Sequence, residues 1–147
     1  MGTLSRKDIV NLLELHSKWL LSDGKDGDPF NHGEVDFRGL NLIGFDLSCA
    51  EMSGGNFSGM HLSNCNFSYA RLLGASFVGA TVKDARFIKA TLDDADFSNA
   101  DLRGASFFRA TLFDARMTGA KLDGADLRRA IYDDAIDMDT TGAVLAG

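Results

Sequence analysis

Hydrophobic residues recur along most of this chain with a period of five. The sequence contains 17 alanines, and 15 of them stand at multiples of five, at Ala50 and at every fifth residue from Ala70 to Ala135. Two residues after each multiple of five, from Phe37 to Tyr132, a core-type hydrophobic residue occurs in 20 positions out of 20. Self-similarity at a fixed period is typical of repeat architectures, so we predict one from residue 35 onward.

A period of five fits neither an ordinary helix nor an ordinary strand. In a helix the hydrophobic side would spiral around the axis, and in a flat strand an odd step would turn every second large residue to the other face. The pattern fits a short extended segment followed by a corner, because the small and the large residue, two apart, then both point inward. Chains of such segments wind into a solenoid with a hydrophobic axis.

The number of sides follows from two further periods. Large core residues alternate between Phe and Leu or Val from Phe57 to Leu112, a period of ten, so the number of sides is even. The corner residues, two after the core positions, repeat with a period of 20, which predicts four sides per coil. At one phase these corners are Gly39, Gly59, Gly79, Asn99 and Gly119, and ten residues later they are Cys49, Tyr69, Lys89, Arg109 and Arg129. Gly and Asn suit a corner with positive φ.

Three runs of five residues show the repeat most clearly: Ala95-Asp96-Phe97-Ser98-Asn99, Ala100-Asp101-Leu102-Arg103-Gly104 and Ala125-Asp126-Leu127-Arg128-Arg129. They resemble the pentapeptide-repeat family, whose pattern is A(D/N)LXX. The resemblance implies an all-β fold, a right-handed four-sided β-helix, here of about five coils at ~4.8 Å per stacked strand. It implies no particular activity. The first coils are expected to pack less regularly, because Val35, Leu40, Phe45, Gly55, Met60 and Cys65 replace Ala.

A helix is expected before the repeats and a short tail after them. Ser5 and Asp8 resemble a capping box, hydrophobic residues then follow helical spacing, and Gly24 ends the helix. We therefore predict an N-terminal α-helical cap and connector (residues 1–34), a β-helix (35–134) and a C-terminal tail or cap (135–147). The less favoured alternative is a helix that binds a membrane surface or a partner. The apolar helical residues are Ile9, Leu12, Leu13, His16, Trp19 and Leu20.

The lattice fails at Asp137, which stands where a core residue belongs. In the tail, Met138, Val144 and Leu145 either fold back as a weak cap or meet a second subunit. The oligomeric state is therefore expected to be a monomer or an end-to-end homodimer.

Composition narrows the function classes. The chain is 45% hydrophobic and has no apolar run near 18 residues, so no membrane span is expected. It has 15 basic and 21 acidic residues, a net charge of −6, which disfavours direct binding of nucleic acid. Two cysteines, Cys49 and Cys65, form no disulfide framework. Charges at Asp8 and Glu14 interrupt any signal-peptide segment, so we expect a cytoplasmic protein.

The sequence offers no catalytic constellation. His16, His32 and His61 have no shared metal spacing, and Cys49 and Cys65 are expected to point to opposite sides of the wall. There is no phosphate-binding glycine loop or nucleophile elbow. We therefore expect no enzyme activity, cofactor or metal. A calcium-loop interpretation of Asp23 to Glu34 is disfavoured, because Lys25 and Gly27 occupy ligand positions.

The outward residues vary, and they form columns of residues 20 apart. One corner column is basic and the next is acidic, and three hydrophobic residues near them point outward although the repeat does not require it. This is either a solvated surface of mixed charge or a docking strip with exposed aromatic residues. The candidate partner surface comprises Ile88, Phe108, Phe113, Lys89, Arg109, Arg129, Asp94, Asp114 and Asp134.

Three functional hypotheses follow. The first is a non-enzymatic scaffold that binds a protein partner through a rigid face. The second, implied by the family resemblance, is a DNA mimic that binds DNA gyrase or topoisomerase. The basic corner column weighs against it, because a DNA mimic needs a broad negative surface. The third is self-assembly through the ends of the solenoid.

Overall fold

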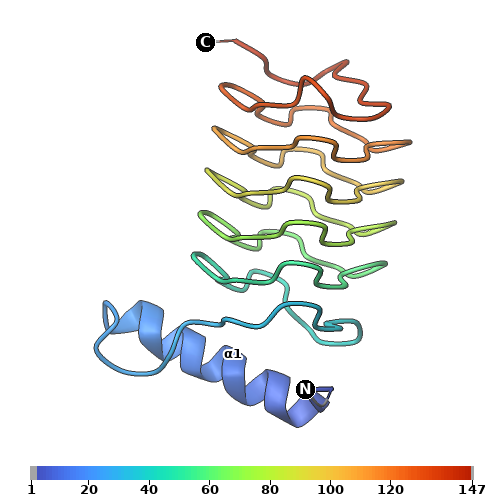
Figure 1. Cartoon of the computed structure of the whole chain (residues 1–147). Coiled ribbons are helices and arrows are strands. Elements are labelled where there is room, and N and C mark those ends of the chain that lie inside the picture. The colour runs from blue at the N-terminus through green and yellow to red at the C-terminus, as the bar shows by residue number, and fades with distance from the viewer. Residues whose placement is uncertain (1–2, 147) are drawn as a thin grey trace.

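The computed structural model describes residues 3–146, and Figure 1 shows a stack of similar coils with one helix at the N-terminal end. Neighbouring coils are joined by single-residue parallel bridges between residues 20 apart, from Asn31 with Glu51 to Arg116 with Ile136. A coil in the middle of the stack has one bridge on each of its four sides. For example, Asn56, His61, Asn66 and Arg71 each pair with the residue 20 positions further on.

Each side repeats the same hydrogen bonds. The Phe77 N–H donates to the carbonyl of Asp96 in the next coil (2.7 Å), and the Asp96 N–H donates back to the carbonyl of Ala75 (2.9 Å). At the corner, the Ala80 N–H donates to the Phe77 carbonyl (3.0 Å), which closes a turn with Gly79 at φ +65°. The backbone of each side is therefore fixed by the coils above and below it.

Two columns of phenylalanine fill the axis. Phe57, Phe77 and Phe97 stack with ring centroids 4.9 and 4.8 Å apart, and the second column, which includes Phe67 and Phe87, has a spacing of 5.0 Å. Rings of the two columns meet edge to face at 5.7 to 5.9 Å. Both geometries are favourable for aromatic pairs. Of the 20 core positions of the sequence pattern, all except the half-buried Tyr132 are buried.

Helix α1 (Arg6–Leu21) lies across the first coil (Figure 1). Ser5 is its N-cap: the Ser5 Oγ accepts from the Asp8 N–H, and the Asp8 carboxylate accepts from the Ser5 N–H. Ile9, Leu13 and His16 are buried against the stack. The helix ends at Leu21, before Gly24.

The first coil is partly separated from the second on one side. The α1 residue Arg6 donates to the carbonyls of Gly39 and Arg38, at 2.8 and 3.0 Å. Leu40, which replaces Ala, is only half-buried and packs on the core cluster that includes α1. Within residues 3–146, the bridge expected between Asn41 and His61 is missing.

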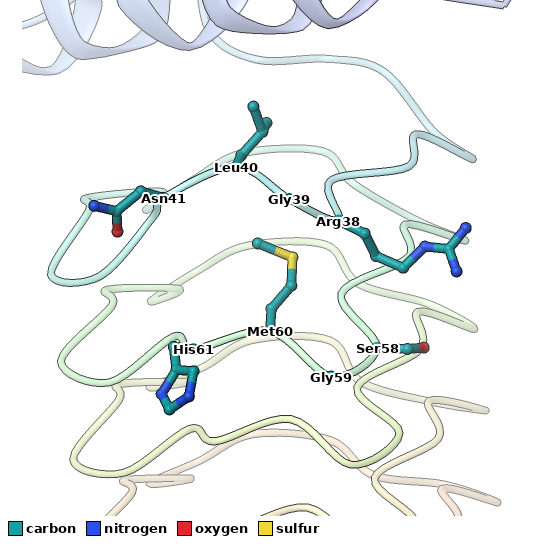
Figure 2. Close-up of a pocket in the computed structure, with 8 residues that line it drawn as sticks. All are labelled: Arg38, Gly39, Leu40, Asn41, Ser58, Gly59, Met60 and His61. Atoms are coloured by element: carbon teal, nitrogen blue, oxygen red, sulfur yellow. The ribbon is translucent and has the colours of Figure 1, made fainter.

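A groove of about 330 Å³ opens in place of this bridge (Figure 2). It is lined by the segments 38–41 and 58–61. The bulk of a leucine and the pull of the Arg6 guanidinium account for the irregular packing of the first coil.

The regular coil also ends abruptly. Asp137 has φ +53°, and its carboxylate accepts from the Thr118 hydroxyl at 2.9 Å instead of entering the core. Val144 then pairs with Asp126, 18 residues before it, so the last partial coil is shorter than the others. Val144 and Leu145 remain 43% and 47% exposed.

Candidate interaction surface

The basic corner column is held in an unusual backbone conformation. Lys89, Arg109 and Arg129 have φ values of +55°, +59° and +60°, and Cys49 and Tyr69 in the same column have +62° and +61°. Apart from Glu34, every other left-handed non-glycine residue among those described is Asn or Asp. Long side chains in this region cost about 1 kcal/mol or more each. Five such residues in one column therefore mark this corner as different from the other three.

The basic residues surround one aromatic ring. The guanidinium groups of Arg109, Arg128 and Arg129 lie 5.4, 5.9 and 6.0 Å from the centre of the Phe108 ring. Arg128 is also held by two hydrogen bonds of 2.9 Å to the Asp126 carboxylate. In the described residues, neither Arg109 nor Arg129 forms an ion pair.

This arrangement corrects the expected aromatic patch. Phe108 and Ile88 point away from the core, but both are half-buried, whereas Phe113 is 40% exposed. The corner at Arg109 separates Phe108 from Phe113, so the two rings lie on different sides of the coil. The three hydrophobic residues do not form one continuous patch.

The acidic corner column lies one side further along each coil. Asp94 and Asp114 have φ values of +58° and +54°, while Asp134 departs from this left-handed conformation. Asp93 beside them accepts from the Phe113 N–H at 3.0 Å. Among residues 3–146, no ion pair links the basic column with the acidic one. The two columns are therefore separate ridges of opposite charge at the two edges of one side.

The side between these ridges also carries exposed hydrophobic residues. Leu73, Phe113 and Ile131 are 47%, 40% and 43% exposed, and Tyr69 at the edge is 54% exposed. We call this side the charge-flanked face. It comprises Tyr69, Leu73, Lys89, Thr91, Asp94, Arg109, Thr111, Phe113, Asp114, Arg129, Ile131 and Asp134. The sequence analysis missed Tyr69, Leu73 and Ile131, although the lattice places 73 and 131 at outward positions.

The remaining chemically active residues have local structural partners. Cys65 is buried, which raises the pKa of its thiol to about 11, and its Sγ donates to the Leu42 carbonyl at 2.7 Å. Cys49 is exposed. An arginine two residues further on holds each of Asp36, Asp101 and Asp126. This pairing lowers the pKa of all three carboxyls, that of Asp36 to about 2.

Neither a metal centre nor a membrane span is found in the described part of the chain. Side chains of His, Cys, Asp and Glu do not gather there in groups of three that a metal ion needs. Helix α1 is also too short and too polar to cross a bilayer.

Comparison with known proteins identifies the class. Residues 46–127 match the family model described as "Pentapeptide repeat region", which is more than half of the chain. The chain therefore belongs to the pentapeptide repeat family, whose solved members are right-handed β-helices. No curated protein matches the chain significantly in sequence.

Individual solved structures support the family assignment. Alr5209, a pentapeptide repeat protein from Nostoc PCC 7120, is 31% identical, with 69% of this chain and 84% of that one covered and a TM-score of 0.60. Rfr23 from the cyanobacterium Cyanothece 51142 is 26% identical, over 58% of this chain and 64% of that one, with a TM-score of 0.46. This chain thus covers less than two thirds of Rfr23. QnrB1, a plasmid-mediated fluoroquinolone resistance protein, is 15% identical, with coverages of 82% and 86% and a TM-score of 0.38.

Proposed function

We propose that this protein is a non-enzymatic scaffold that binds another protein through its charge-flanked face. The observation that carries the proposal is the combination of exposed Leu73, Phe113 and Ile131 with two unpaired ridges of opposite charge at the edges. A hydrophobic centre with a polar rim is the usual anatomy of a protein interface. Membership of a family of repeat scaffolds is consistent with this role.

The rigidity of the face favours binding. The Phe113 N–H is held by Asp93, and the Phe113 carbonyl accepts from the Asp94 N–H at 2.8 Å. A partner therefore needs to order only side chains, which keeps the entropic cost of association low. The exposed charges of Arg109 and Asp114 would govern encounter rate and selectivity more than final affinity.

The proposal is tested by capture from an extract of the native host. The immobilised protein is compared with the double variant Leu73→Ser/Phe113→Ser, and bound proteins are identified by mass spectrometry. Ile43→Ser is the matched control, because Ile43 is 57% exposed on a different side of the coil. We expect the double variant to lose the partner and keep its melting temperature, and the control to retain both. Equal capture by all three proteins would place binding elsewhere.

Self-assembly through the C-terminal end is a second candidate. Within residues 3–146, the sides at Ile131 and Ile136 have no further coil paired with them, and Ile136 is 41% exposed. An unpaired strand edge with apolar neighbours is prone to pair with another chain. Ile136→Glu is expected to lower the solution mass if the end is an interface, and analytical ultracentrifugation would measure this.

Binding to DNA gyrase is the less favoured proposal. The ridge of Lys89, Arg109 and Arg129 interrupts the negative surface that imitation of DNA would need. We therefore expect a supercoiling assay with gyrase and a quinolone to show neither inhibition nor rescue at high protein concentration. Either effect would reverse the order of these two hypotheses.

A further inference from the structure

We propose that the charge-flanked face binds a second copy of this chain, side by side, with the two solenoid axes parallel. This inference rests on the proposed function, because it names the partner of the same face. It differs from end-to-end assembly, which would use the last coil.

The two ridges have matching positions along the stack. Lys89 and Asp94 lie at the two edges of one side in one coil, and Arg109 with Asp114 and Arg129 with Asp134 repeat this arrangement 20 and 40 residues further on. Successive members of each ridge are therefore about 4.8 Å apart along the axis. Each coil presents a positive charge at one edge of the face and a negative charge at the other.

A twofold axis parallel to the solenoid and lying in the interface exchanges the two edges. Arg109 then faces Asp114 of the partner subunit at the same height, and Asp114 faces Arg109 of the partner subunit. The same operation pairs Lys89 with Asp94 of the partner subunit. Three coils therefore supply six opposite-charge pairs, and the exposed hydrophobic residues of the two faces meet between them.

The other face-to-face arrangement is disfavoured. A twofold axis perpendicular to the solenoid leaves the edges unexchanged, so that the basic ridge would face a basic ridge and the acidic ridge an acidic one. Juxtaposed like charges oppose association. The charge pattern therefore selects the parallel orientation.

Two features of the single chain support a second copy as the occupant. The ridge charges form no ion pairs with each other within residues 3–146, so they are available to a partner. Lysine and arginine also occupy left-handed corners at 89, 109 and 129, where glycine would be less strained. A self-complementary pattern on one face is what a twofold dimer requires.

The face is narrow, and its ion pairs are exposed at the rim. We therefore expect a weak dimer whose dissociation constant rises with salt, because exposed pairs are screened. Sedimentation velocity over a concentration series, at low and at high salt, measures this constant for the full chain.

The decisive experiment mixes two single variants, Arg109→Asp and Asp114→Arg. In a dimer of either variant alone, like charges face each other at this coil twice, and we expect about a tenfold weaker association or more. In the mixed dimer, Asp at 109 faces Arg at 114, and Asp114 faces Arg109, so both contacts are attractive. We expect the equimolar mixture to recover the affinity of the parent protein. Both variants remain net negative, so overall charge does not explain the recovery.

Asp84→Arg is the matched control, because Asp84 has the same left-handed conformation (φ +55°) on a different corner. Its mixture with Arg109→Asp is expected to show no recovery. Melting temperatures confirm that each variant is folded.

Several outcomes would overturn the inference. A parent protein that is monomeric at all concentrations contradicts it, and if Leu73→Ser/Phe113→Ser still abolishes capture of a different protein, the proposed function stands without it. A dimer that Ile136→Glu dissociates while the mixture shows no recovery places self-association at the solenoid end. Equal association of the parent and both single variants rules out this face as the interface.

Discussion

Each phenylalanine of the axis has far more contacts than one on the surface. The Phe77 ring stacks on those of Phe57 and Phe97 and meets two further rings edge to face. Replacing Phe77 with Ala would leave a cavity that the fixed coils cannot close. We expect a loss of about 3–5 kcal/mol in the free energy of unfolding, measured by urea denaturation. Phe113→Ala should cost far less, and equal losses would mean that the inside and outside of the repeat are assigned wrongly.

His16 makes stability dependent on pH. Its ring is buried, Nδ1 accepts from the Phe30 N–H at 3.0 Å, and Nε2 has no partner in the described residues. Burial lowers the pKa of His16 below its ordinary value of 6.5, although the charge of Asp46 opposes this. The unfolded chain therefore binds the proton first on acidification, and stability falls as the pH drops below about 6.5.

This dependence is measured from the denaturation midpoint between pH 8 and pH 5. We expect His16→Gln to flatten the profile, whereas His61→Gln, on the exposed wall, should leave it unchanged. A parent midpoint that is constant over this range would contradict the assignment.

At the scale of elements, α1 depends on its N-terminal capping box. The reciprocal bonds between Ser5 and Asp8 satisfy donors that the first turn leaves free. We expect Ser5→Ala to destabilise the helix by about 1 kcal/mol, visible as faster amide exchange over residues 6–21. The bonds that join the coils should keep their protection, so uniform loss along the whole chain would show that α1 and the coils unfold together.

The missing bridge beside α1 gives another prediction at this scale. In the described residues, the His61 N–H has no acceptor, whereas the Thr81 N–H at the equivalent place donates to the Met60 carbonyl at 2.9 Å. We expect the His61 amide to exchange with solvent much faster than the Thr81 amide in NMR experiments. Equal protection would mean that the groove is closed in solution.

The pattern of elements was accessible from the sequence because one short rule repeats. The period of five located the core positions from Phe37 to Leu127, and the period of 20 identified the columns of residues that stack. The groove was harder to predict, since it depends on the contact of Arg6 with the carbonyl of Gly39, 33 residues away. The partial burial of Phe108 depends on how three arginine side chains fold over it, and no spacing rule specifies that.

The candidate surface could be found only in part for a related reason. Leu73, Phe113 and Ile131 are far apart in sequence and occupy two different positions within the five-residue unit. They are recognised as one face only when the corner columns on both sides are placed. Charge, in contrast, follows the corner phase directly, so both ridges were evident from the sequence.

At the scale of the whole molecule, contacts run only between neighbouring coils. Stability in such an array is approximately a sum of coil and interface contributions, so a defect acts locally at an end and more widely in the middle. Phe87 stacks on both Phe67 and Phe107, whereas Met117 lies near the C-terminal end of the core. We therefore expect Phe87→Ala to lower amide protection on both sides of the defect. Met117→Ala should lower it mainly from Arg116 onward and leave the bridge of Ser76 with Asp96 protected. Hydrogen exchange followed by mass spectrometry measures both profiles, and identical, uniform losses would show that the solenoid unfolds as one cooperative unit.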